Sequence, residues 1–475
     1  MKTLIALAML CTACAFAQEP HQHQHPETPP PSQKKEKTQE QDKTQEKKMP
    51  PMQMPEHAGH TMPEHAPMHA VALHAQFSSG TAWQPAAAPS PMWMTMRGAW
   101  DLMAHGNVFV TYNQQGGPRG VGKLESMNWA MLMEQRQLGP GTLLFRQMFS
   151  AEALTAPHAG FPQLFQTGET YRQRPLVDRQ HPHDVFGELS VLYAVPLGER
   201  VSWFGYGGPA GEPALGPVAF MHRASAAEIP AAPLGHHLQD STHISYGVVT
   251  TGFVVAPRGG ALKLEGSAFN GREPDERRAT IDLGPLDSWA LRVGANLNPR
   301  WSAQYSVGHL VHPEALEPGD TLRQTASVAY SRALRDGHWC TTLLWGRNRK
   351  EQEHTTQNGY LLESVVNFAQ HNYGFTRMEL VDKDELFAGR PAPEFDPTFP
   401  PGRTLAAQPT FRIGAFTFGG VRDVVHNHAW QIGLGAGVTF YEKPAALDAS
   451  YGRNPVSLQL FVRMRPGGMD HQAGR

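Results

Sequence analysis

A short stretch near the N-terminus combines methionine and histidine at a fixed spacing. The segment Met54 to Thr61 reads MPEHAGHT, and MPEHAPMH follows at once over Met62 to His69, so the repeat is eight residues long. Thioether sulfur is a soft ligand that suits Cu(I), and imidazole binds copper, zinc or nickel. We therefore predict a copper site with the ligands Met54, His57, His60, Met62, His65, Met68 and His69. A nonspecific histidine-rich tract or compositional drift is the alternative.

A second group of residues with suitable chemistry lies in two stretches farther along the chain. The first stretch holds an arginine, two histidines and an aspartate, and the second holds four histidines and an aspartate. Three hypotheses stay open: charges that pin long loops to a wall, a constriction that selects ions, or a metal site in which Asp184 or Asp240 orients an imidazole. The residues are Arg179, His181, His183, Asp184, His222, His236, His237, Asp240 and His243.

The elements that must position these residues show the two-residue period of β-strands. Between Ser288 and His309, apolar residues such as Leu291 and Val293 alternate with polar or small ones such as Arg292. In a transmembrane barrel the apolar face meets lipid and the other face lines the lumen. A soluble sandwich shows the same alternation. Strands of about 9 to 14 residues favour the barrel, because they match a tilted span of a hydrocarbon core about 30 Å thick.

Short and long connections alternate between the candidate strands. Turn residues mark the short ones, near 138–141, 196–199, 257–260, 298–299, 336–337, 370–372 and 423–427. Polar connections such as 155–180, 208–241, 347–357 and 381–407 are longer. The pattern predicts an all-β fold, an antiparallel up-and-down transmembrane barrel of about 16 strands, or 14 if the segments after Asn372 and around Phe411 are not strands. An even count places both termini in the periplasm.

Composition divides the chain into four parts. Residues 1–17 read as a secretory signal peptide, because Lys2 and an apolar run precede Ala15-Phe16-Ala17. Residues 18–100 are predicted to be a disordered periplasmic tail, rich first in Pro, Gln and Lys and then in Met and His. Residues 101–466 form the barrel, and 467–475 form a short C-terminal extension. Cys340 alone remains after signal removal, so no intrachain disulfide framework is expected.

The repeat from Met54 to His69 and this order of parts resemble the outer-membrane copper resistance protein B family. Its members join a signal peptide and a Met/His-rich periplasmic segment to a β-barrel. The resemblance implies copper tolerance at the outer membrane of a Gram-negative-type cell, either by binding periplasmic copper or by letting it out.

The sequence thus predicts an outer-membrane barrel that binds and passes a copper ion and is not an enzyme. Asp240, Ser241 and His243 are too close in sequence to form a working triad in a strand. Expected partners are outer-membrane lipid, a metal ion and periplasmic copper-handling proteins. A net charge of −2 without a basic patch argues against nucleic acid, and the oligomeric state stays open. A general porin-like channel for another small solute is the main alternative, and a soluble metal-binding sandwich is a third.

Overall fold

The described part of the chain belongs to a single unit. The computed structural model describes residues 79–156, 160–240, 244–256, 259–316, 319–387 and 409–467. The chain divides into the units Met1–Thr61 and Met62–Arg475, and every described residue lies in the second. No helix among these residues is long and apolar enough to cross a membrane.

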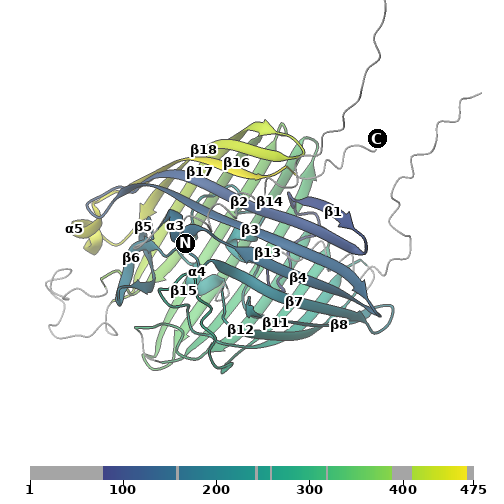
Figure 1. The fold of residues 1–475 in the computed structure, drawn as a ribbon. Helices are drawn as coiled ribbons and strands as arrows, with labels where there is room; N and C mark the ends of the chain where they lie inside the picture. Colours follow the sequence, from purple (N-terminus) through teal and green to yellow (C-terminus); the bar gives the residue numbers. More distant parts are fainter. Residues whose placement is uncertain are drawn as a thin grey trace, which may run out of the picture. The chain divides into compact units, whose positions relative to one another are not determined.

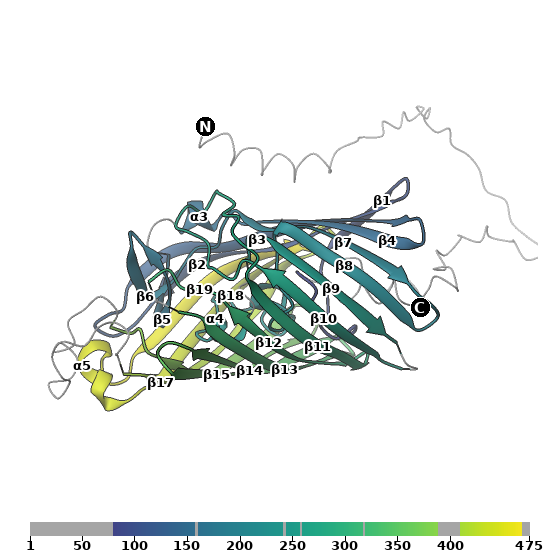
Figure 2. The ribbon, with the colours of Figure 1, turned by 90° about the horizontal axis from the view of Figure 1, so that it is seen from below.

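Sixteen strands of the described chain form a closed antiparallel barrel (Figures 1 and 2). Each strand pairs with the next around the barrel, and β19 pairs with β2 to close the sheet. The strands are β2 (Trp100–Gln114), β3 (Gly122–Leu138), β4 (Gly141–Phe149), β7 (Phe186–Pro196), β8 (Val201–Ala210), β9 (Val248–Val255), β10 (Ala261–Phe269), β11 (Ser288–Asn298), β12 (Trp301–Leu310), β13 (Thr321–Leu334), β14 (Gly337–Lys350), β15 (Thr355–Phe368), β16 (Asn372–Lys383), β17 (Phe411–His426), β18 (Trp430–Glu442) and β19 (Val456–Pro466). The predicted count of 16 is confirmed, and the alternative of 14 is wrong because β16 and β17 are both strands.

The remaining elements are short and lie at the ends or inside the barrel. Strand β1 (Trp93–Arg97) pairs with the first residues of β2, while β5 (Phe161–Tyr171) and β6 (Arg174–Gln180) form a separate hairpin between β4 and β7. The short helices are α3 (Glu152–Thr155), η1 (Phe220–His222), α4 (His236–Gln239), η4 (Ala445–Leu447) and α5 (Asp448–Tyr451). Helix α4 contacts β13, β14 and β15, and Figure 2 shows it among the strands.

The two faces of the wall have opposite chemistry. In β11, the outward side chains of Leu291 and Val293 are 52% and 50% exposed, whereas the inward Arg292 is 3% exposed and bonds Glu265 of β10 at 2.9 Å. The same alternation of exposed and buried residues runs through β9, β10, β15 and β19. The predicted assignment of apolar residues to the outer face is confirmed for these strands, and the lumen receives the charged ones.

The connections also alternate in length, as predicted. The short turns gather at one end of the barrel and the longer connections at the other. The connection between β14 and β15 is shorter than predicted: β14 ends at Lys350 and β15 begins at Thr355, so residues 351–354 replace the predicted loop over 347–357. The flanking strands continue in register to the Lys350–Thr355 pair, and this pairing shortens the loop.

The described chain begins inside the lumen. Ser79 and Thr81 are 1% and 0% exposed, and the indole of Trp83 lies 4.5 Å from the Lys263 ammonium of β10. The backbone then leaves at the short-turn end, where the N–H of Ala87 donates to the carbonyl of Pro299. The boundary predicted at residue 100 therefore differs from the structure, because residues 79–100 belong with the barrel rather than with the tail.

Candidate functional site

The connection between β8 and β9 lies inside the lumen. We call its residues Gly211 to Asp240 the plug. Most of its side chains are buried, among them Leu215, Phe220 and Leu238, although its only regular elements are η1 and α4. Connecting segments normally run over a protein surface. Here the barrel wall supplies the surroundings that bury the segment, so the bore is occupied by its own chain.

A buried group of ion pairs fastens the middle of the plug to the wall. Arg223 donates to Asp240 at the end of the plug at 2.7 Å and to Glu363 of β15 at 2.6 Å. Glu363 also accepts from Arg377 of β16 at 3.1 Å. All four side chains are almost inaccessible to water. Removing one member of such a group leaves an uncompensated buried charge, which costs about 3–5 kcal/mol.

A second group holds the part of the plug around Glu228. This carboxylate pairs with Arg463 and, at 2.7 Å, with Arg465, both of β19. Arg463 also pairs with Asp423 of β17. The plug is therefore tied to opposite charges on two separate parts of the wall, and these ties define one position for it in the bore.

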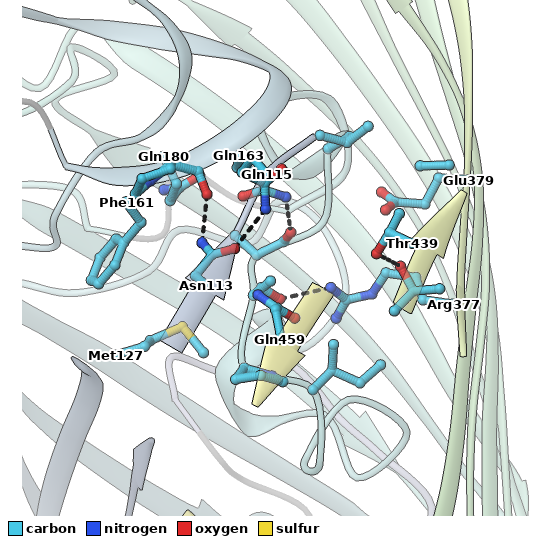
Figure 3. A pocket seen from close by; sticks show the side chains of 18 of the residues that line it. Asn113, Gln115, Met127, Phe161, Gln163, Gln180, Arg377, Glu379, Thr439 and Gln459 are labelled. Atoms are coloured by element: carbon cyan, nitrogen blue, oxygen red, sulfur yellow. Dashed lines mark hydrogen bonds between the residues drawn. The ribbon is translucent and has the colours of Figure 1, made fainter. Parts of the chain in front are cut away.

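Little space remains beside the plug in the described lumen. One cavity there has a volume of about 40 Å³. In Figure 3, Asn113, Gln115 and Phe161 lie on one side of it and Arg377 and Glu379 on the other. That volume holds a few water molecules at most. Passage of anything larger through this part of the barrel requires the plug or the β5–β6 hairpin to move.

Four of the predicted histidines meet where the chain after β6 passes α4. His181 and His183 come from that chain, and His236 and His237 come from α4. One ring nitrogen from each of His181, His236 and His237 lies within 4.8 Å of the other two. The ring centroids of His181 and His183 are 5.5 Å apart. We call these four residues the histidine cluster; it joins segments more than fifty residues apart in sequence.

Glutamates orient three of the four imidazoles. Nδ1 of His181 lies 3.0 Å from Glu169, Nδ1 of His183 lies 2.7 Å from Glu152, and Nδ1 of His237 lies 2.9 Å from Glu273. Metal-binding histidines usually have one ring nitrogen fixed in this way by a carboxylate. Our expectation that Asp184 or Asp240 plays this part is not met: Asp184 bonds Tyr246 and Arg278, and Asp240 bonds Arg223.

Burial and neighbouring charges shift the acidity of these groups in opposite directions. Burial by itself would lower the pKa of His183, but the Glu152 carboxylate outweighs it and the pKa is raised. The pKa of His237 falls well below its usual value because the ring is buried and Lys383 and Arg323 lie near it. Burial raises the pKa of Glu169 to about 7 despite the nearby Arg278. The Glu152 carboxylate and the nearby cations therefore shift the pKa values of His183 and His237 in opposite directions.

The other predicted residues lie apart from the histidine cluster or outside the described residues. Arg179 lies in β6, where it pairs in register with Pro162 of β5. His222 lies in η1 and faces Met148 of β4. His243 and the tail ligands from Met54 to His69 fall outside the described residues.

Sequence reasoning missed the glutamates of the site. Glu152, Glu169 and Glu273 come from three connections or inner elements, and nothing in their local sequence marks them as partners of a histidine. The high density of histidines in these loops was the only feature of the sequence that pointed to a site here. Of the three imidazoles whose nitrogens converge, His181 and His237 each have a carboxylate behind them. Such a set suits zinc, nickel or copper and agrees with the metal-site hypothesis. Salt links of Arg278 to Glu169 and Asp184 support the structural hypothesis at the same place.

A closed sheet of sixteen antiparallel strands, with an apolar outer face and a charged lumen, defines an outer-membrane β-barrel. No protein-family model and no curated protein matches the chain.

Several solved barrels are similar to the chain at low identity. The anion-selective porin from Comamonas acidovorans is 12% identical over 77% of this chain and 99% of that one, with a TM-score of 0.46. Outer-membrane expressed OmpT of Vibrio cholerae is 8% identical over 78% and 100%, with a TM-score of 0.43. OmpF of Salmonella typhi, in complex with daunomycin, is 7% identical over 78% and 100%, with a TM-score of 0.43. The fold class rests on the strand pairing itself, and no property of these proteins is transferred to this chain.

Alkaline pH is expected to loosen the start of the plug. Burial, together with the Glu188 carboxylate, raises the pKa of Glu212 from 4.5 to about 8, although Arg146 and Arg292 oppose the shift. Because the folded state holds this proton more tightly than an exposed glutamate does, the plug loses stability as pH rises from about 4.5 to about 8, by roughly 1.4 kcal/mol per pH unit. Hydrogen exchange of the peptide around 211–220, corrected for intrinsic rates, should therefore speed up over this range. Glu212→Gln should abolish that dependence; an unchanged pH profile in the variant would contradict it.

Proposed function

We propose that this outer-membrane barrel handles copper or another soft metal ion. In this mechanism the methionines and histidines from Met54 to His69 capture the ion in the periplasm, where both termini lie, and the barrel passes it without catalysis. The observation that carries the proposal is the recurrence of Met-Pro-Glu-His-Ala after eight residues, with further Met and His residues completing each copy. The resemblance to the copper resistance protein B family agrees with this proposal. Periplasmic copper-handling proteins would donate the ion to the tail.

The occupied lumen supports a specific cargo rather than free diffusion. A hydrated solute needs an open bore, whereas a metal ion without its water shell can move between protein ligands that lie a few ångströms apart. Three cavities beside the plug in the described lumen measure about 40 Å³, 20 Å³ and 20 Å³, and His181, His183 and His237 line one of the two smaller ones. Imidazoles at such a narrow point fit an ion better than a larger solute.

A porin-like channel for another small solute is the rival function. The inward charges of the wall, such as Arg292 and Glu265, favour it, because charged rings also select ions and charged solutes in open pores. Deleting Met54 to His69 separates the two. Copper sensitivity of the cells with unchanged permeation of uncharged solutes supports metal handling, whereas the absence of a copper phenotype supports the porin.

Replacing the Met and His residues of the repeat by alanine is expected to remove the tight Cu(I) binding of the tail. The purified full-length protein in detergent is titrated with Cu(I) in competition with a chromophoric chelator, beside this variant. A control variant changes Pro55, Glu56, Pro63 and Glu64 to alanine, which alters the same segment but keeps every ligand. Loss of bound copper in the first variant alone supports the tail site. Equal copper binding by all three proteins would overturn it.

A further inference from the structure

A row of soft ligands crosses three neighbouring strands on the lumen side of the wall. His105 of β2 stands opposite Met131 of β3, and Met131 stands opposite Met148 of β4. Directly paired side chains on one face of a sheet have Cβ atoms about 4.5–5.5 Å apart. The plug adds His222, whose Nε2 lies 3.3 Å from the sulfur of Met148. Two thioethers and two imidazoles therefore meet in the barrel interior.

The donor atoms in this row are buried but incompletely bonded. Met131 and Met148 are 0% and 3% exposed, and His222 is 8% exposed. Nε2 of His105 and Nδ1 of His222 are inaccessible to water and have no hydrogen-bond partner among the described residues. A buried polar nitrogen without a partner costs about 1–3 kcal/mol. A metal ion bound by the His105 nitrogen would offset that cost.

The spacing between His222 and Met148 suits two ligands of one ion. With metal–nitrogen bonds of about 2.0 Å and metal–sulfur bonds of about 2.3 Å, two ligands of one tetrahedral ion lie about 3.5 Å apart. The 3.3 Å between His222 and Met148 is close to that distance. Gly187 of β7 leaves the room for this sulfur, because a Cβ there would stand 3.2 Å from it. Thioethers select soft ions such as Cu(I) and Ag(I) over zinc or nickel.

The first described residues of the chain lie next to this row. Glu188 of β7 stands opposite Met148 in register and accepts the N–H of Gly80 at 3.2 Å. Arg146, two residues before Met148, donates to the carbonyl of Gly80. His69, the last ligand of the repeat, is ten residues before Ser79, and ten residues span at most about 35 Å. The ten residues between His69 and Ser79 are therefore long enough for the repeat to reach the row.

We propose that His105, Met131, Met148 and His222 form a second binding site, inside the lumen, for a soft monovalent cation such as Cu(I) or Ag(I). This inference rests on the proposed function, because the lumen site receives the ion from the tail. It differs from the histidine cluster, which holds no thioether. Packing alone is the competing explanation, because the ring centroids of Trp129 and His222 are 4.2 Å apart and Trp129 belongs to the same hydrophobic cluster as Met131 and Met148.

The test uses the full-length protein in which the Met and His residues from 54 to 69 are alanine, so that the repeat contributes no ligand. Ag(I) is titrated as a redox-stable probe, the bound ion is counted by native mass spectrometry, and X-ray absorption reports sulfur in its coordination shell. Met148→Leu conserves volume and removes the sulfur. Met133→Leu is the matched control, because Met133 is buried in the same wall and lies one place outside the row. Heat-modifiable electrophoretic mobility shows that each barrel is folded.

We expect the tail variant to bind one Ag(I) through sulfur, with affinity at least tenfold weaker after Met148→Leu and unchanged after Met133→Leu. The lumen site would be overturned if the tail variant bound no Ag(I). It would also be overturned if neither Met148→Leu nor Met133→Leu changed the affinity for Ag(I). If the unaltered tail and the alanine tail bind equally and Met148→Leu removes the binding, the lumen site stands and the tail site of the proposed function fails.

Discussion

Arg223→Ala is expected to free the plug and raise the conductance of the barrel in planar bilayers. Arg223 balances two buried carboxylates, Asp240 at 2.7 Å and Glu363 at 2.6 Å. Glu363 keeps Arg377, but Asp240 loses its charged partner. The substitution removes the Arg223–Glu363 tie between plug and wall and leaves Asp240 as an uncompensated charge inside the plug. The cost of about 3–5 kcal/mol therefore falls on the plug and its attachment and not on strand pairing. We therefore expect the plug to leave its position with the barrel still closed.

An exposed ion pair provides the control for this experiment. Arg272 and Asp287 pair at 2.8 Å in the connection between β10 and β11, where their side chains are 35% and 33% exposed. Exposed pairs contribute at most about 1 kcal/mol, so Arg272→Ala should leave conductance as it is. Equal conductance of Arg223→Ala and the unaltered protein would show that the ion pairs do not hold the plug in the bore.

The wall could be predicted from the sequence because its signals are local. Alternation of apolar and polar residues identifies strands such as β11, and turn residues such as Asn298-Pro299 end them. The two doubtful segments show where the signal weakens. In β17 glycines interrupt the alternating pattern. Gly419 is required there, because the Phe375 ring occupies the place that a side chain at this position would take. A cross-strand contact of that kind leaves no mark in the local pattern.

The plug could not be predicted from the sequence because its burial depends on distant partners. Its residues are rich in Ala, Gly and Pro and show neither strand nor helix periodicity. Arg223 and Glu363 are 140 residues apart, and Glu228 and Arg465 are 237 apart. The histidines at 181, 183, 236 and 237 could be identified as a group by their density. Their glutamate partners and the His105–Met131–Met148 row could not, because only strand register and loop docking bring them together.

Gly346→Ala is expected to push α4 away from the wall and to expose the histidine cluster. A Cβ at this position in β14 would stand 2.2 Å from the carbonyl oxygen of Leu238, which is backbone and cannot rotate aside. Strand β14 pairs along its length with β13 and β15, so α4 is the partner that must move. The shift would also break the bond from the Asn348 amide to the carbonyl of His237.

Overpacking of this kind costs about 1–3 kcal/mol, and each 1.4 kcal/mol changes an opening equilibrium about tenfold. Hydrogen exchange of the peptide covering 234–240 should therefore be roughly ten times faster in Gly346→Ala, with the strands of the wall still protected. Gly374→Ala is the matched control, because Gly374 lies in β16 and a Cβ there would meet nothing within 4 Å. Equal protection of 234–240 in both variants would mean that α4 does not rest on Gly346. Faster exchange in Gly346→Ala alone would establish that the contact between α4 and Gly346 of the wall fixes the position of His236 and His237.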